Sequence, residues 1–411
     1  MSNELAVGQS RVGFIVDGDS ETPLLAAELS RSDRGIFISI PFELNQMPVS
    51  RWFSGRTIRY GDDPDWSKHS YEVPEQLHFV DVDGTVGLVG CRSRGLRSQL
   101  GLGVSRGQAD VRYAVLGTSN GLDFNSVSGF RSELTGLGSW LSATSIREER
   151  EVDAESRLKC ITYRLEAGSD IEVDPLQGLR LIASFSADSD RIGHRSLQDR
   201  FLIESSTTMP SDWASHIDLH QSVRDLVNVA AWKPLDFVAH HARRGDDPHR
   251  ALDGTSYGEA WREVVTTAAQ ASIGGDVVAE PKHIDWLFDF NSVGPEGVRD
   301  WLRIRAEKGR AIAPIVNLLF MKHAALETRF AQLGIGLEAL GYLIALEQRV
   351  PRKQADSMSF AERLKLIFAD TKIAPPIDSA AWVTATTDTY NRLFRIEGVV
   401  LVRGDRRVLA V

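Results

Sequence analysis

Residues 76–89 read QLHFVDVDGTVGLV and set the pattern for the first half of the chain. Two short segments rich in β-branched and aromatic residues, 76–82 and 85–89, flank Asp83-Gly84. Glycine tolerates the positive φ that a tight type I′ turn demands. The stretch therefore predicts a β-hairpin. Asp81-Val82-Asp83-Gly84 resembles the start of a calcium loop but lacks the rest of it.

Segments of the same type recur as far as residue 207, separated by clusters of Gly, Asp, Asn and Ser. This spacing is typical of an antiparallel sandwich or a distorted barrel. The segments are residues 11–16, 24–29, 35–42, 57–60, 109–116, 128–134, 160–165, 179–184 and 199–204. Residues 138–146, which include Trp140, predict a short helix or turn between strands. We therefore expect a β-rich N-terminal domain over residues 1–207.

The next segment, residues 208–290, mixes the two patterns. Residues 211–232 carry apolar side chains at helical spacing, and Ser211 or Asp212 can cap the first turn. Three short apolar stretches in the same segment suggest strands, at residues 235–239, 261–266 and 286–290. We expect this segment to connect the two larger parts of the chain.

The last third of the sequence predicts helices. Gly294-Pro295 opens one helix that runs through about Lys308, and a long helix then continues to about Gln348. The apolar residues of this stretch recur at intervals of three, four and seven, which lines one buried stripe along a helix. They are Leu319, Leu326, Phe330, Leu333, Leu337, Leu340 and Ile344.

Two further helices follow. Ser359-x-x-Glu362 matches a capping box, and Pro375-Pro376 ends the helix that it opens. The last helix starts near Asp378 or Ser379 and ends at Gly398. Four helices in this order predict a bundle over residues 291–398, followed by a tail over residues 399–411. The fold class is therefore α+β, a β-rich N-terminal sandwich or barrel-like region followed by a C-terminal helical bundle.

Composition narrows the class of protein. With 411 residues, 42% of them hydrophobic and 25% charged, the chain falls in the globular range. The longest nearly unbroken apolar run, residues 311–321, is shorter than the roughly 20 residues that cross a bilayer. The first ten residues lack the order of a secretion signal, and Cys91 and Cys160 form no metal-ligand spacing. We expect a cytoplasmic protein that makes no contact with a membrane.

Charge is unevenly divided along the chain. Residues 291–411 contain 18 lysines and arginines against 13 aspartates and glutamates, which gives +5, whereas the whole chain carries −9. The basic residues of this part gather in three clusters. They are Arg299, Arg303, Arg305, Lys308 and Arg310, then Arg349, Arg352 and Lys353, then Arg392 and Arg395. Phosphate contacts and an ordinary solvated helix face are both consistent with this pattern.

Standard catalytic signatures are missing from the sequence. There is no phosphate-binding G-x-x-x-x-G-K-[ST] loop, no H-E-x-x-H, no paired C-x-x-C and no EF-hand loop. We therefore expect no cofactor and no metal. Residues 117–121 satisfy G-x-S-x-G, but no helix follows to place the Ser119 hydroxyl, so a plain turn is the better interpretation.

One region of the sequence combines histidines with arginines. His240, His241 and His249 lie near Arg243 and Arg244, and Arg244 and His249 fit an R-x4-H spacing. An arginine that holds a phosphate beside a histidine can cleave RNA without metal. The intervening Gly-Asp-Asp-Pro is a loop sequence rather than a helix, which favours a solvated loop.

The order of several short motifs resembles one family. They are VSGFRSELTGLGSWL at 127–141, WLFDF at 286–290, VRDWL at 298–302, LETRF at 326–330 and IGLEAL at 335–340. Over about residues 10–397 they resemble the ApeA-like anti-phage proteins, which have an ApeA N-terminal domain and a C-terminal HEPN domain. The resemblance implies a role in abortive infection, in which the N-terminal region senses or regulates and the HEPN bundle cuts RNA, usually as a dimer.

HEPN ribonucleases use an R-N-x-x-x-H motif on the last helix. The resemblance implies that the arginine binds the scissile phosphate and that the histidine handles the 2′-hydroxyl proton. In residues 390–395 only Asn391 matches, because Tyr390 stands in the place of the arginine and Arg395 in the place of the histidine. Acid–base catalysis without a group that titrates near neutrality loses a factor on the order of 100 to 10,000.

Two functions therefore stay open. The first is a metal-independent endoribonuclease, regulated by the N-terminal domain, with Asn391, Arg392 and Arg395 at its site. The second is a degenerate bundle that binds RNA, dimerises or regulates, because Arg392 and Arg395 lie on one helix face and can hold phosphate. The expected partners are RNA, either tRNA or mRNA, a phage-derived trigger and a second copy of the chain. The expected RNA-binding residues are Arg299, Arg303, Arg349, Arg352 and Lys353.

Overall fold

A computed structural model of the chain describes its residues in segments. They are residues 3–16, 24–43, 46, 49–54, 62, 64–65, 71–118, 123–189, 193–251, 253–267, 283–321, 323–371 and 376–394. The backbone contacts divide the chain into two compact units. The sheet unit comprises Met1–Ala231 and Leu235–Arg299, and the helical unit comprises Trp232–Pro234 and Asp300–Val411.

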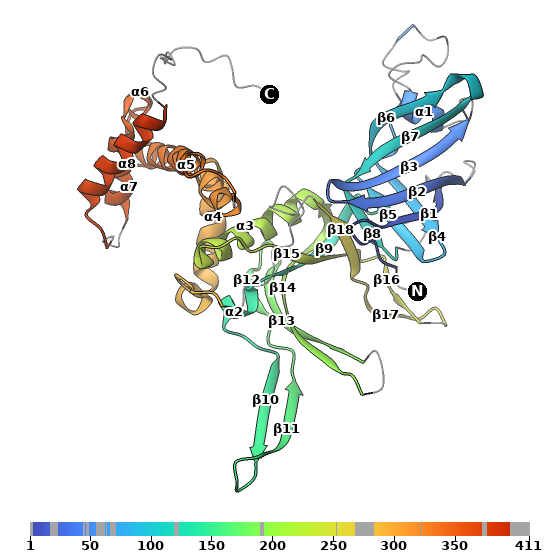
Figure 1. Cartoon of the computed structure of the whole chain (residues 1–411), viewed down its shortest axis with the longest axis horizontal. Helices are drawn as coiled ribbons and strands as arrows, with labels where there is room; N and C mark the ends of the chain where they lie inside the picture. The colour runs from blue at the N-terminus through green and yellow to red at the C-terminus, as the bar shows by residue number, and fades with distance from the viewer. Residues whose placement is uncertain are drawn as a thin grey trace. The chain divides into compact units, whose positions relative to one another are not determined.

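One large antiparallel sheet dominates the sheet unit (Figure 1). Its strand order is β12-β13-β14-β9-β15-β18-β8-β5-β4-β1-β2-β3-β7-β6. The bounds are β1 Ser10–Val16, β2 Leu25–Ser32, β3 Gly35–Glu43, β4 Gln76–Asp81, β5 Gly84–Val89, β6 Arg92–Gln99, β7 Val104–Val111, β8 Tyr113–Leu116, β9 Ser126–Leu134, β12 Ile171–Asp174, β13 Leu179–Asp188, β14 Ser196–Asp212, β15 Phe237–Arg243 and β18 Arg262–Thr266. The expected β-rich N-terminal region is confirmed.

The predicted hairpin forms between β4 and β5, with the turn one residue earlier than expected. Asp81 pairs with Gly84, so Val82 and Asp83 make the two-residue loop. The Asp81 carboxylate accepts hydrogen bonds from the backbone N–H groups of Asp83 and Gly84, and Gly84 has a φ of 134°. A side chain that binds its own turn in this way is typical of aspartate.

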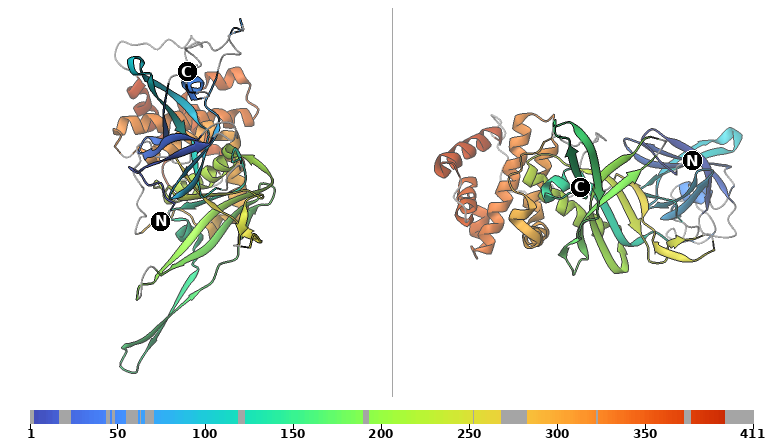
Figure 2. Two further views of the ribbon diagram at one scale, coloured as in Figure 1. Left: turned by 90° about the vertical axis from the view of Figure 1, so that its right-hand side faces the viewer. Right: turned by 90° about the horizontal axis from the view of Figure 1, so that it is seen from below.

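Two smaller hairpins and short helices complete the sheet unit. Strands β10 (Ile146–Val152) and β11 (Leu158–Leu165) form a hairpin that extends away from the sheet (Figure 2). Strands β16 (Pro248–Arg250) and β17 (Ser256–Glu259) form another. The sheet unit also contains α1 (Val49–Ser54), η2 (Leu100–Leu102), α2 (Leu137–Leu141) and α3 (Trp213–Ala231). Helices α2 and α3 confirm the expected helical elements near Trp140 and after residue 211.

Helix α3 packs on β14 and β9 and buries one of its faces there. Trp213 at its first turn donates a hydrogen bond of 2.7 Å from Nε1 to the carbonyl oxygen of Phe124. Its ring also stacks on Tyr113 with 4.4 Å between ring centroids. The apolar periodicity of the sequence therefore describes a face that packs against the sheet.

The start of the next helix was predicted wrongly. Residues 286–290 form no strand, because α4 (Phe290–Asn317) already begins at Phe290. The Asp289 carboxylate accepts hydrogen bonds from the backbone N–H and the hydroxyl of Ser292, and so caps the helix. Gly294, with a φ of 61°, and Pro295 consequently lie inside the helix rather than at its start.

Two further differences concern segment boundaries. The helix expected to end at about Lys308 continues as α4 to Asn317, and the long helix expected as far as Gln348 is interrupted, since η3 (Leu318–Phe320) follows α4 and α5 (Leu326–Glu347) begins only at Leu326. Residues 109–116 form the end of β7 and all of β8, with Arg112 between the two strands. The strand expected at residues 57–60 and the end of the last helix at Gly398 lie outside the described residues.

Short helices pack on α5 in the helical unit. They are α6 (Arg352–Ser357), α7 (Phe360–Asp370) and α8 (Ser379–Phe394). The predicted capping box is confirmed, because the Ser359 side chain accepts from the backbone N–H of Glu362 and the Glu362 side chain accepts from that of Ser359. Phe360, Leu364 and Val383 form the buried core of this group. Helices at the C-terminal end confirm the α+β class.

Helix α5 is less covered than the predicted stripe implies. Ile344 is buried, but Phe330, Leu333, Leu337 and Leu340 are half-buried, and Leu326 is 76% exposed. By length and composition this helix is long and apolar enough to cross a membrane. The core helix of a soluble protein can have the same length and composition. Only 28% of its apolar stretch is buried among the described residues.

Candidate functional site

The predicted catalytic residues lie at the end of α8. The Asp378 carboxylate caps this helix by accepting from the backbone N–H groups of Ala380 and Ala381. Val383 and Thr386 turn inward, whereas Asn391 and Arg392 are exposed. The third predicted residue, Arg395, lies outside the described part of the chain. The structure thus places two of the three predicted residues side by side on an accessible turn.

Tyr390, in the place of the catalytic arginine, is held inside the helical unit. Its ring stacks on Phe360 with 4.3 Å between centroids, and its hydroxyl donates to Glu338 Oε2 over 2.9 Å. It also covers Gly334 so closely that a Cβ there would approach the ring to 2.4 Å. Burial, and then the hydrogen bond to Glu338, raises the pKa of the tyrosine hydroxyl. This residue is therefore a neutral packing side chain and not a phosphate ligand.

Glu338 connects Tyr390 to a second buried group. Its Oε1 accepts from Arg363 Nη1 over 2.7 Å, and Arg363 Nη2 donates to the backbone oxygen of Ala355 over 3.1 Å. These contacts join α5, α6, α7 and α8 through side chains that are already paired with one another. The only histidine of residues 291–411 is His323, which is exposed in the segment before α5. Neither the contacts of Glu338 and Arg363 nor the place of His323 before α5 supplies α8 with a group that exchanges protons near neutral pH.

The predicted RNA-binding residues do not form one set. Arg299 belongs to the sheet unit, where it donates to the backbone oxygen of Val173 in β12 over 2.8 Å. Arg303 pairs with Asp300 one helical turn away, over 3.0 Å.

The remaining three predicted RNA-binding residues cluster. Arg349 follows α5 with a φ of 62°, and Arg352 and Lys353 begin α6. All three are exposed. The turn from Arg349 to Lys353 therefore presents three cations within five residues.

Sequence reasoning missed a chain of alternating serine and histidine side chains between α3 and the sheet. In order, its members are Ser211, His216, Ser205, His220, Ser132 and His240. His220 is central, with Nδ1 2.7 Å from Ser132 Oγ and Nε2 3.0 Å from Ser205 Oγ. Each of these hydroxyls also contacts a second histidine, at 2.9 Å from His240 Nδ1 and 2.6 Å from His216 Nδ1.

Burial keeps these imidazoles neutral. It lowers the pKa of His240 to about 3, and it lowers the pKa values of His220 and His216 as well. A neutral imidazole has one donor and one acceptor, and a hydroxyl can take both roles, so an alternating chain satisfies all its members without charge. All of these side chains are buried except that of Ser211, which is half-buried, and they join α3 to β9, β14 and β15. The serine–histidine chain therefore stabilises the sheet unit and offers no access to a substrate.

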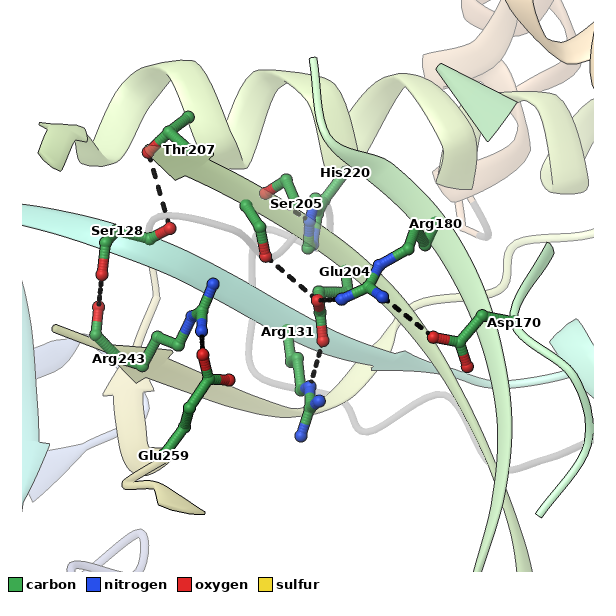
Figure 3. Close-up of polar contacts among 11 residues, drawn as sticks. Ser128, Arg131, Asp170, Arg180, Glu204, Ser205, Thr207, His220, Arg243 and Glu259 are labelled. Atoms are coloured by element: carbon green, nitrogen blue, oxygen red, sulfur yellow. Dashed lines mark hydrogen bonds and ion pairs between the residues drawn. The ribbon is translucent and has the colours of Figure 1, made fainter. Parts of the chain in front are cut away.

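A second network surrounds the buried carboxylate of Glu204 (Figure 3). Its carboxylate, 1% exposed, accepts from Arg131 Nε over 2.6 Å and from Arg180, which also pairs with Asp170 over 3.0 Å. Burial alone would raise the pKa of Glu204, but the two arginines outweigh it and lower that pKa. Nearby, Arg243 pairs with Glu259. Three arginines thus face three carboxylates. Because the opposite charges balance, we interpret the network as a contact that links neighbouring strands.

The other candidates from the sequence are not assembled into a site. Arg244 pairs with Asp246 over 2.7 Å, whereas His249 stacks on Tyr257 with 5.7 Å between centroids. The described contacts therefore give these two residues separate partners. Ser119 lies outside the described residues. Within the described ranges, no group of three or more His, Cys, Asp or Glu side chains is placed to hold a metal ion.

Comparison with known proteins gives one match. A family model described as ApeA N-terminal domain 1 matches residues 54–302, more than half of the chain. No curated protein and no solved structure matches the chain. The matched range contains the serine–histidine chain and the Glu204 network, and it ends within α4. It supports the antiviral setting of abortive infection that the sequence motifs imply. The chain belongs to the family of ApeA-like proteins.

Proposed function

We propose that this protein acts in anti-phage abortive infection and that its C-terminal bundle, HEPN-like by resemblance, binds RNA without cleaving it. The proposal includes a cytoplasmic location, a homodimer and regulation of the bundle by the N-terminal domain in response to a phage-derived trigger. The observation that carries it is the packing of the half-buried Tyr390 ring against Phe360 and Gly334, with its hydroxyl bound to Glu338.

The geometry at Tyr390 argues against cleavage. A metal-free ribonuclease needs one cation on the scissile phosphate and one group that exchanges protons near neutral pH. Tyr390 cannot supply the cation, and its raised pKa keeps its hydroxyl protonated. Arg395 cannot supply the proton-exchanging group, because arginine stays protonated in proteins. The chain therefore retains phosphate-binding side chains but lacks the acid–base partner.

The charge distribution argues for binding. Residues 291–411 carry a formal charge of +5, and the turn with Arg349, Arg352 and Lys353 is exposed. Arg392 is exposed at the end of α8 beside Asn391. Arginines bind phosphate oxygens through two parallel hydrogen bonds, and lysine adds a point charge. These residues are the phosphate contacts of the proposal.

Metal-independent cleavage is the second candidate. It is favoured by one observation, the exposure of Asn391 and Arg392 together on the last described turn of α8. In this reading Arg392 holds the phosphate in place of the missing arginine.

The test measures binding and cleavage on the same samples of the full chain. Labelled tRNA and mRNA are incubated with the protein in EDTA, binding is followed by fluorescence anisotropy at several salt concentrations, and RNA integrity is read on a denaturing gel. We expect salt-sensitive binding of intact RNA. The triple variant R349A/R352A/K353A should reduce the slope of log affinity against log salt by about 2, since each phosphate contact to a single strand contributes roughly 0.7.

A matched control separates local contacts from total charge. The triple variant R147A/R157A/K159A removes the same charge from the exposed β10–β11 hairpin and should leave affinity and slope unchanged. RNA that is cut by the wild type, and spared by N391A, R392A and R395A, would replace the binding proposal with the second candidate. Absence of any salt-dependent binding would sink both.

A further inference from the structure

A hollow lined by arginines lies at one end of the large sheet. Strand β6 ends the strand order and pairs only with β7 among the described strands (Figure 1). The hollow has a volume of about 550 Å³. Among the described residues its lining consists of Arg94, Gly95, Leu96, Arg97, Arg106 and Gln108, and none of these carries a carboxylate. This volume falls in the range of about 300–1,000 Å³ that is typical of small-ligand pockets.

The strand register brings the cations together. Arg97 of β6 pairs with Arg106 of β7, so their side chains lie directly opposite on one face of the sheet. Like charges in opposite positions destabilise a sheet. Gly95 stands opposite Gln108 with a φ of 125°, directly after an irregularity in β6 that lies between Ser93 and Gly95 and so includes Arg94. The hollow is thus built from two strands at a point where the register changes.

Two of the three guanidinium groups contact other residues of the sheet unit. Arg94 lies 3.5 Å from Asp110 and stacks over the ring of Phe37, 4.9 Å from its centroid. Arg106 donates to Ser39 Oγ and pairs with Glu28 over 3.2 Å. Arg97 makes no hydrogen bond or ion pair with any described residue. The hollow is thus surrounded by two guanidinium groups that have protein partners and by a third that has none among the described residues, an arrangement that suits a ligand with several anionic oxygens.

We propose that this hollow binds a small phosphorylated ligand, with Arg94 and Arg106 as preorganised phosphate ligands and Arg97 as the side chain that closes on the phosphate. The site belongs to the sheet unit and is independent of the RNA contacts proposed for the helical unit. A free phosphate ion and the phosphates of a nucleotide share the required chemistry, so both serve as probes.

The alternative role of these arginines is protection of an edge strand. Charged side chains and irregularities on an edge strand discourage pairing with other chains. The β10–β11 hairpin offers the matched comparison, because Arg147 and Arg164 are also paired across two strands there. That pair lines none of the hollows described in the sheet unit. An arginine pair alone is therefore not the feature on which the proposal rests.

The experiment is calorimetric titration of the full chain with inorganic phosphate and, separately, with ATP at low salt. We expect saturable binding that R97A weakens about tenfold, the loss expected for one charge-assisted contact. R97K should weaken it less, and R147A should leave it within twofold. Tighter binding of ATP than of phosphate identifies the nucleotide as the ligand, and equal binding identifies the phosphate group alone.

Three results would overturn the proposal. The first is no saturable binding of either probe to the wild type. The second is an equal loss of affinity in R97A and R147A, which would mean that the ligand responds only to the total charge of the protein. The third is increased self-association of R97A with unchanged affinity, measured by analytical ultracentrifugation, which assigns Arg97 to edge protection. Circular dichroism of each variant checks that the sheet is intact.

Discussion

The sheet unit and the helical unit bury their side chains to different degrees. In the sheet unit, Leu29, Ile38, Phe79 and Leu88 are 0% exposed, and several polar side chains, such as His220, Ser132 and Glu204, are buried in hydrogen-bonded networks. In the helical unit, α5 is the most apolar helix, yet only 28% of its apolar stretch is buried among the described residues. The difference indicates that the sheet unit has the more completely buried core, whereas α5 of the helical unit leaves much of its apolar surface exposed among the described residues.

The largest predicted effects on stability come from two truncations, one in each unit. Trp140 is 0% exposed and packs edge-on against Phe290, with 5.5 Å between centroids, so Trp140→Ala should lower the free energy of unfolding by about 3–5 kcal/mol. Leu340 on α5 is half-buried, so Leu340→Ala should cost about 1–2 kcal/mol. Urea denaturation followed by circular dichroism measures both. Equal losses would show that the helical unit is as tightly packed as the sheet unit.

The second predicted effect is a loss of folding stability in acid, caused by buried histidines of the sheet unit. Burial lowers the pKa of His240 to about 3 and that of His220 well below its usual value. The unfolded chain therefore binds more protons than the folded chain between about pH 3 and pH 6.5. The stability is complete above about pH 6.5 and is lost as the pH falls, by about 2 kcal/mol at pH 5 for each fully suppressed histidine.

Denaturation at pH 7 and pH 5 tests this sign. The stability difference between the two pH values should shrink by about 2 kcal/mol in His240→Gln, which keeps hydrogen-bonding groups but does not titrate. His249→Gln, at an exposed position on β16, serves as the control. If His240→Gln changes with pH as the wild type does, then His240 is not held neutral by burial.

The sequence predicted those features that depend on neighbouring residues. The β4–β5 hairpin follows from an Asp-Gly pair between two apolar strands, and the α7 cap follows from Ser359 and Glu362. The cap at Asp289 is equally local, but the short apolar stretch 286–290 resembles a strand and concealed it. A helix start can therefore be missed when a strand-like pattern runs directly into it.

Features assembled from distant strands were not predictable. Ser132 and Ser205 meet His220 only because β9 and β14 pair under α3. One local signal existed, since His216 and His220 are four residues apart and so share a helix face. Strand β6 was missed because its glycine and arginines do not resemble a buried strand. The place of Tyr390 followed from the family motif, but its contact with Glu338 needed the packing of α8 on α5.

A third, smaller effect concerns the polar contact inside the helical unit. Tyr390→Phe removes the hydroxyl that donates to Glu338 but keeps the ring on Phe360. We expect a loss of about 1 kcal/mol in the free energy of unfolding, because Glu338 keeps its contact with Arg363. RNA affinity should not change. Thr389→Ala, at an exposed position one residue away, is the control for local helix effects. A marked loss of RNA binding in Tyr390→Phe would give the hydroxyl a role beyond packing.

The smallest effects come from two glycines of the helical unit, and they should differ in sign. Replacement of a helical glycine by alanine stabilises a helix by up to about 1 kcal/mol, unless the added Cβ meets a fixed neighbour. At Gly309 the nearest atom is the mobile end of Arg305, so Gly309→Ala should raise the free energy of unfolding by about 0.5–1 kcal/mol. At Gly334 the Cβ would lie 2.4 Å from the Tyr390 ring, which is held by Phe360 and Glu338, so Gly334→Ala should lower it by about 1 kcal/mol. Both changes are read from urea denaturation curves. A stabilising Gly334→Ala would mean that Tyr390 moves aside easily, which contradicts the fixed packing of Tyr390 on which the proposal of binding without cleavage rests.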